Sequence, residues 1–146
     1  MDSVIFLAQS DTTAGFLSRS DIRICEVKQK SKAILLESCD LAHIKQVSRI
    51  PPILNKSIRR IKKTSFIFPN NRSFRVVCED CDVLHYRFLR RFGMLYSSSA
   101  NKNTMKFDYD FAFKNADIII YDNRGIYENT PSCIFNVRKN RLKKIR

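Results

Sequence analysis

Several short polar segments of this chain carry hydroxyl and amide groups directly beside apolar, strand-forming residues. Ser10-Asp11-Thr12-Thr13 follows the apolar residues 4–8, and Ser98-Ser99-Ala100-Asn101 follows residues 94–97. Pro131-Ser132-Cys133 opens a third apolar stretch. Hydroxyls and backbone N–H groups at a helix N-terminus bind phosphate and carboxylate oxygens. The pattern therefore favours an anionic ligand, although residues 10–13 by themselves are more typical of an ordinary helix N-cap.

Two lysines lie close together in a similar position. Lys28-Gln29-Lys30 follows residues 22–27, where alternating apolar and polar residues predict a strand. In an extended segment, residues i and i+2 point to the same side, so both ammonium groups could contact one phosphate chain. A solvated lysine at such a position contributes little to folding. We therefore expect Lys28 to be exposed to its ligand and dispensable for the fold.

A metal site is the main alternative chemistry. Cys78 and Cys81 form a Cys-x-x-Cys pair, and His85 follows four residues later. Structural zinc takes four ligands, usually as two local pairs, and the sequence contains no second pair. The five cysteines are an odd number, so they cannot form a closed disulfide framework. We expect Cys78 and Cys81 to be free thiols and assign no metal ligands.

The charge of the chain is strongly and unevenly positive. The 146 residues include 27 Lys and Arg against 14 Asp and Glu, which gives a formal net charge of +13. Residues 43–63 hold seven basic residues, residues 138–146 hold six, and neither block contains an acid. Such blocks attract nucleotide phosphates or RNA, and they are equally typical of a solvated basic surface.

Length and hydropathy predict one domain, which we place at residues 1–146. The longest apolar runs are far shorter than the ~18 residues that cross a bilayer. Met1-Asp2-Ser3 does not resemble the start of a secretory signal. We therefore expect a cytoplasmic protein.

Periodicity predicts the elements that must position these segments. Apolar runs and two-residue alternation predict strands, and apolar residues three or four apart predict helices. The predicted strands are residues 4–8, 22–27, 33–36, 65–68, 74–77, 94–97, 118–121, 133–137 and 142–145. The predicted helices are residues 41–47, 54–61, 84–92 and 110–114, and residues 14–17 could open another. Intermixed strands and helices indicate an α/β fold around a mixed sheet.

Taken in order, these segments resemble the YrdC-like family of threonylcarbamoyl-adenylate synthases. The family's Pro-Thr-(Asp/Glu)-Thr-Val-Tyr-Gly-Leu motif is similar to residues 9–16, and its Lys-x-Arg to residues 28–30. Its Val-Arg-(Val/Ile)-Pro resembles residues 74–77, and its Ser-Ala-Asn matches Ser99-Ala100-Asn101. Its Pro-Ser-Thr resembles residues 131–133. The resemblance covers nearly the whole chain without rearrangement.

The resemblance implies a twisted mixed parallel and antiparallel sheet with flanking helices around a positively charged cavity. It implies ATP-dependent synthesis of L-threonylcarbamoyl-adenylate from L-threonine and bicarbonate, with Mg²⁺ beside ATP and partner proteins that modify tRNA. Lys28 and Lys30 would be the catalytic, triphosphate-binding residues. The nucleotide would also contact Ser99, Asn101, Ser132 and Arg146. Threonine or bicarbonate would contact Ser10, Thr12 and Arg75.

Departures from the family pattern include Ile61-Lys62-Lys63 in place of a Pro-Gly-Pro, and they weaken the expectation of activity more than that of fold. Lys30 stands where the family has arginine, which keeps the charge but loses the planar fork for bidentate phosphate contacts. Ala14 replaces an aromatic residue. The alternative is a non-catalytic module on the same fold that binds double-stranded RNA or a nucleotide.

The two basic blocks generate a prediction about RNA. If residues 43–63 and 138–146 face one duplex, binding releases counterions, so affinity for double-stranded RNA should fall steeply with salt. Fluorescence anisotropy between about 50 and 200 mM salt measures this slope. Binding that is absent at low salt, or indifferent to ionic strength, would leave only a solvated basic surface.

Overall fold

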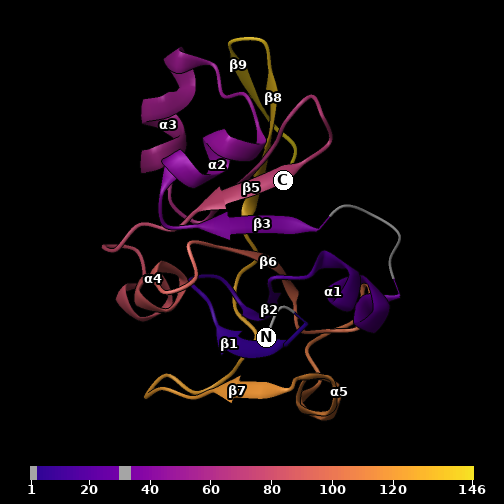
Figure 1. Ribbon diagram of the computed structural model, residues 1–146. Coiled ribbons are helices and arrows are strands. Elements are labelled where there is room, and N and C mark those ends of the chain that lie inside the picture. The colour runs from indigo at the N-terminus through magenta and orange to yellow at the C-terminus, as the bar shows by residue number, and fades with distance from the viewer. Residues whose placement is uncertain (1–2, 30–33) are drawn as a thin grey trace.

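The computed structural model describes residues 3–29 and 34–146, and its strands form one mixed sheet (Figure 1). In chain order the strands are β1 (Phe6–Gln9), β2 (Ala14–Ser18), β3 (Leu35–Ser38), β4 (Thr64–Ile67), β5 (Ser73–Val76), β6 (Met94–Ser99), β7 (Ile118–Ile120), β8 (Cys133–Arg138) and β9 (Arg141–Lys144). Their order across the sheet is β7-β1-β2-β6-β3-β5-β4-β8-β9. The pairs β1–β7, β3–β5 and β4–β8 are parallel, and the other pairs are antiparallel. The α/β fold with a mixed sheet is confirmed.

The helices flank this sheet. They are α1 (Asp21–Lys28), α2 (Leu41–Val47), α3 (Asn55–Arg60), α4 (Val83–Arg90) and α5 (Tyr109–Asn115), with the short 3-10 helix η1 (Pro52–Leu54) before α3. The four helices predicted at residues 41–47, 54–61, 84–92 and 110–114 correspond to α2 to α5, and all four are confirmed. Four of the helices have an N-cap residue whose side-chain oxygen accepts a hydrogen bond from a backbone N–H of the first turn. These N-cap residues are Ser20, Asp40, Asp82 and Asp108. Within residues 3–29 and 34–146, no helix has the length and apolar character needed to cross a membrane.

One face of the central strands is apolar. Because side chains alternate along a strand, Leu36, Phe66 and Phe74 point to the same side of β3, β4 and β5. They pack against Ile44 of α2 and Ile58 of α3, which are fully buried. This cluster is the largest of three in the described core and fixes the sheet against α2 and α3.

The opposite face of the same strands is polar and lies on the side of α4. Glu37 of β3 is the register partner of both Arg75 on β5 and Leu95 on β6. Leu95 packs in one cluster with Leu89 of α4 and Leu17 of β2. Helix α4 therefore covers part of this face, beside a group of buried polar side chains.

The segment 22–27 is helical, so the prediction of a strand there is wrong. Ser20 caps α1 by accepting a hydrogen bond from the backbone N–H of Arg23, at 3.4 Å. Only Ile24 and Lys28 of α1 are buried, and they lie four residues apart, whereas Ile22 is 65 % exposed. The alternation of apolar residues that indicated a strand does not correspond to a buried face.

Residues 14–17 do not open a helix. They lie in β2, which pairs with β1 in an antiparallel hairpin closed by Gln9 and Ala14. Residues 10–13 are therefore a hairpin loop, and the interpretation of this segment as a helix N-cap is wrong. The predicted strand 33–36 begins outside the described residues, and β3 follows at Leu35–Ser38.

Candidate functional site

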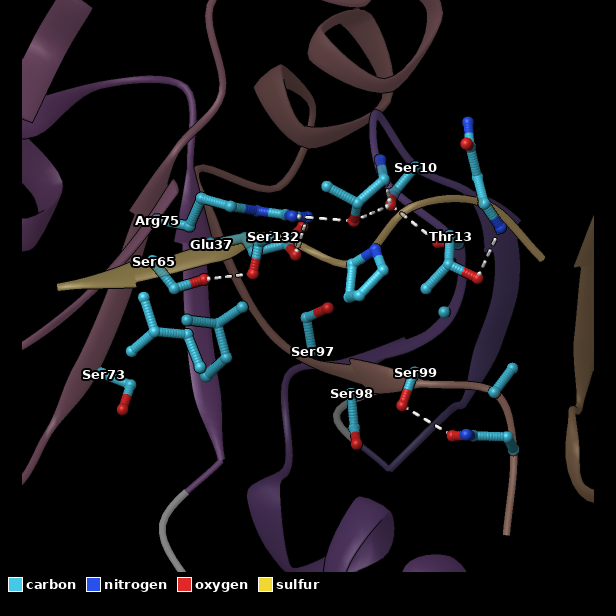
Figure 2. A pocket seen from close by; sticks show the side chains of 18 of the residues that line it. Ser10, Thr13, Glu37, Ser65, Ser73, Arg75, Ser97, Ser98, Ser99 and Ser132 are labelled. Carbon is cyan, nitrogen blue, oxygen red and sulfur yellow. Dashed lines mark hydrogen bonds and ion pairs between the residues drawn. The ribbon is translucent and has the colours of Figure 1, made fainter. Parts of the chain in front are cut away.

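A cavity of about 670 Å³ opens on the polar face of the sheet (Figure 2). Its lining comes from strands β2 to β6 and β8, from the loop between β1 and β2, and from the segments that follow β6 and precede β8. Seven of the nine predicted site residues line it: Ser10, Thr12, Arg75, Ser99, Asn101, Ser132 and Arg146. The structure therefore brings together residues that are up to 136 positions apart in the chain.

Hydroxyl groups dominate the lining. They belong to Ser10, Thr12, Thr13, Ser65, Ser73, Ser97, Ser98, Ser99, Thr104 and Ser132. The charged residues of the described lining are two arginines and two glutamates, namely Arg75, Arg146, Glu37 and Glu128. Their formal charges cancel among the described residues, so the positive character expected of the cavity stays a prediction.

The hairpin loop 10–13 is ordered by a directed chain of hydrogen bonds. Arg75 Nη1 donates to Thr12 Oγ1 at 2.9 Å, and Ser10 Oγ donates to the carbonyl of Thr13 at 2.7 Å. Thr12 Oγ1 and Ser10 Oγ are 3.1 Å apart. Because the one proton of Ser10 goes to Thr13, Thr12 is the donor of that bond. Both hydroxyl protons are thus used, and Thr12 Oγ1 keeps one lone pair to accept an N–H from a ligand.

Arg75 is the centre of a buried ionic network that the sequence did not reveal. Its side chain is 3 % exposed, and Nη2 contacts Asp11 Oδ1 at 3.1 Å and Glu37 Oε1 at a shorter distance. The second oxygen of Glu37 lies 2.8 Å from His85 Nε2. The signal that could have found Glu37 is an acidic residue inside the apolar strand β3, where a charge must have a partner.

The network changes the acidity of both carboxyl groups. Burial by itself would raise the pKa of Glu37, but Arg75 and the hydrogen bond from His85 outweigh it and lower this pKa from 4.5 to about 2. Burial raises the pKa of Asp11, and Arg75 only partly opposes that shift. Glu37 is therefore ionised throughout the physiological range.

Lys28 does not line the cavity, and its predicted environment is wrong. It ends α1 and is only 3 % exposed. Its ammonium donates to the carbonyls of Ser99 and Asn101, the first at 2.8 Å, and to Asn101 Oδ1 at 3.0 Å. Lys28 thus holds the segment after β6 in place. Lys30 lies outside the described residues.

The side chain of Asn101 acts within the same segment. Its Oδ1 accepts from Ser99 Oγ at 2.6 Å as well as from Lys28, and its Nδ2 donates to the carbonyl of Met105 at 2.6 Å. Asn101 therefore fixes the Ser99 hydroxyl at the cavity wall (Figure 2).

Ser132 and Arg146 form the wall on the β8 side. Ser132 Oγ lies 3.0 Å from Ser65 Oγ of β4. Arg146 donates from Nε and Nη2 to the carbonyl of Ser132, at 3.1 and 2.9 Å. The two predicted nucleotide contacts are thus joined to each other.

The alternative metal ligands are not brought together. Cys78 and Cys81 are free thiols in the turn before α4, and Cys78 Sγ donates to the carbonyl of Arg59. His85 points to Glu37 instead. In the described part of the chain, no group of three or more His, Cys, Asp and Glu residues is placed to hold a metal ion.

Comparison with known proteins identifies the fold but no sequence family. No protein-family model and no curated protein sequence matches the chain. Among solved structures, E. coli YciO is similar with a TM-score of 0.70 at 13 % identity, over 98 % of this chain and 82 % of that one. P. abyssi Sua5 complexed with L-threonine gives 0.71 at 12 % identity, over 99 % and 50 %.

Full-length HypF, solved with phosphate and nucleotide, gives a TM-score of 0.73 at 12 % identity, over 99 % of this chain and 27 % of HypF. The chain thus spans about half of Sua5 and about a quarter of HypF. Together these likenesses show the YrdC-like fold.

The ionic network predicts a loss of stability in acid. Because the pKa of Glu37 is lowered on folding, its contribution is complete above pH 4.5 and is lost as pH falls toward 2. The loss is about 3 kcal/mol for Glu37 alone. Asp11 opposes part of it, since its raised pKa favours the native state as protons bind.

Urea unfolding at pH 6 and at pH 2.5 measures this loss, and Glu37→Gln should remove most of the difference. Glu26→Gln is the matched control, because Glu26 is exposed on α1. Equal pH dependence in the wild type and in Glu37→Gln would contradict the assignment.

The contacts of Lys28 predict a structural role. Lys28→Met buries an apolar group in place of the ammonium and leaves three part-buried oxygens without that donor, so we expect a loss of about 1 to 3 kcal/mol in the free energy of unfolding. Lys45→Met, at an exposed position of α2, should change it by less than about 0.5 kcal/mol. A Lys28→Met variant of wild-type stability would show that the ammonium is available to a ligand.

Proposed function

We propose that this protein synthesises L-threonylcarbamoyl-adenylate from L-threonine, bicarbonate and ATP. The observation that carries the proposal is that one cavity collects seven residues assigned to such a site from the sequence. These residues come from separate segments, and the arrangement depends on the whole sheet rather than on one local motif.

Two solved structures of similar fold support an amino acid and a nucleotide as ligands of this cavity. Sua5 was solved with L-threonine and HypF with phosphate and nucleotide. A cavity of about 670 Å³ lies within the 300 to 1,000 Å³ common for small-ligand sites. We assign the amino acid to the hairpin side, near Thr12 and Arg75, and the nucleotide to the wall formed by Ser99, Ser132 and Arg146.

The reaction needs alignment more than a protein nucleophile. The threonine amine attacks the carbon of bicarbonate, and water leaves as the carbamate forms. A carbamate oxygen then attacks the α-phosphorus of ATP, and pyrophosphate leaves. Thr12 Oγ1 accepts an N–H of threonine, which orients the nitrogen, and the guanidinium of Arg146 offsets charge on the phosphates. Mg²⁺ enters as the ion of MgATP, held chiefly by phosphate oxygens.

The product belongs to tRNA modification. A partner protein transfers the threonylcarbamoyl group from the adenylate to adenosine in tRNA, which gives threonylcarbamoyladenosine. The basic blocks 43–63 and 138–146 are the surface that we assign to tRNA or other double-stranded RNA.

The second candidate function is a module that binds a nucleotide or double-stranded RNA without turnover. The observation that favours it is the cancelled charge of the lining, since polyphosphate binding gains from uncompensated cations. Lys30 in place of arginine points the same way.

Pyrophosphate release separates the two functions. We expect purified protein with MgATP to release pyrophosphate only when threonine and bicarbonate are both present. Arg146→Ala should lower the rate at least about ten-fold through loss of a phosphate contact, whereas Arg87→Ala, at an exposed position of α4, should not change it. ATP binding without pyrophosphate release under any condition would establish the binding module instead.

A further inference from the structure

His85 lies behind the cavity and pairs with Glu37, which lines it, and the proposed reaction uses neither side chain. His85 is 1 % exposed, belongs to α4 and is not part of the cavity lining. Glu37 is equally buried, and its carboxylate lies between His85 Nε2 and Arg75 Nη2. A buried ion pair contributes little net stability compared with apolar side chains of the same size, so stability alone does not explain why this pair is present.

The proton positions follow from the charge of Glu37. An ionised carboxylate only accepts hydrogen bonds, so His85 Nε2 carries the proton and donates it. The other ring nitrogen, Nδ1, is buried without a hydrogen-bond partner. Among the described residues, the imidazole therefore has one polar contact, the hydrogen bond to Glu37, and that contact orients the carboxylate.

The backbone of His85 is itself held firmly. Asp82 Oδ1 caps α4 and accepts from the backbone N–H of His85 at 3.0 Å. Arg124 pairs with the other oxygen of Asp82 and donates to the carbonyl of Gln9 at 3.2 Å. Helix α4 is thus tied to the end of β1, next to the hairpin loop that Arg75 orders.

We propose that His85 and Glu37 are positioning residues, which fix the Arg75 guanidinium so that Thr12 presents its lone pair to the amino-acid substrate. The inference rests on the proposed function for the identity of that substrate. The pair acts on the threonine side of the cavity and leaves the nucleotide wall unchanged, because the hydrogen bonds of Ser132 and Arg146 in the described structure involve neither His85 nor Glu37.

The test replaces His85 in two ways. His85→Gln retains an N–H donor near the position of Nε2, and His85→Leu removes it while filling a similar volume. His43→Leu is the control. His43 Nδ1 lies 3.1 Å from the hydroxyl of Ser38, and Ser38 is the residue next to Glu37 on β3. Calorimetry with L-threonine alone and with MgATP alone gives the two affinities, and thermal melts show that each variant is folded.

We expect His85→Leu to weaken threonine binding at least ten-fold, with MgATP binding within three-fold of wild type. His85→Gln and His43→Leu should bind both ligands within three-fold. Loss of both ligands in parallel, or an unchanged threonine affinity in His85→Leu, would overturn the inference, because a merely structural histidine gives one of those results.

A second measurement does not depend on the ligand. In ¹⁵N NMR, the Nε–H of Arg75 should be ordered in the wild type and in His85→Gln, and mobile in His85→Leu. Wild-type protein that binds no threonine would contradict the proposed function, and the Arg75 signal would then decide the positioning role. An ordered Arg75 in His85→Leu would reject that role whatever the ligand.

Discussion

The contact between Arg75 and Glu37 is the interaction on which the cavity depends. The two residues are register partners on the parallel strands β3 and β5, and both are almost fully buried. Removing a charge from water costs several kcal/mol, so neither side chain could occupy this face without the other. With Asp11 as a second carboxylate, the guanidinium also draws the hairpin loop onto the sheet. The ion pair thus joins three segments that are distant in the chain.

The alternation of side chains explains how one set of strands serves two purposes. Leu36, Phe66 and Phe74 supply the apolar face that holds α2 and α3. Their neighbours Glu37 and Arg75 face the cavity side. A register slip of one residue in β3 would exchange the two faces, which would bury the acid in the core and expose the leucine. Folding and site formation are therefore specified by the same pattern.

Sequence periodicity was sufficient for the elements whose buried side chains follow a clear period. Leu41, Ile44 and Val47 predicted α2 correctly, since all three contact one core cluster. The prediction of a strand at residues 22–27 was wrong because Ile22 is exposed and Lys28 is buried. Both residue types usually have the opposite preference. Ser20, a residue type that favours helix N-caps, directly precedes α1 and is the local signal for the helix.

The site was predictable where its residues form local motifs and unpredictable where partners meet only in the fold. Ser99 and Asn101 belong to one short motif, and both lie at the cavity. Glu37 and His85 are 48 residues apart on different elements, and nothing in the sequence pairs them. Lys28 was predicted to follow a strand and to face a phosphate. It ends a helix instead, and its ammonium donates to backbone carbonyls of the segment after β6.

The fold separates the excess positive charge of the chain from the cavity lining. Most cations of the basic blocks lie outside the cavity, and Leu142 of the second block packs against the same cluster as Ile44 and Ile58 of the first. The two blocks therefore lie on the same part of the molecule, and Arg146 is the basic residue of these blocks that lines the described cavity. An anion is attracted by the blocks over about 8 to 10 Å at physiological salt. Inside the cavity, hydroxyl groups predominate and the two arginines are balanced by the two glutamates, so the described lining offers directed hydrogen bonds rather than a net positive charge.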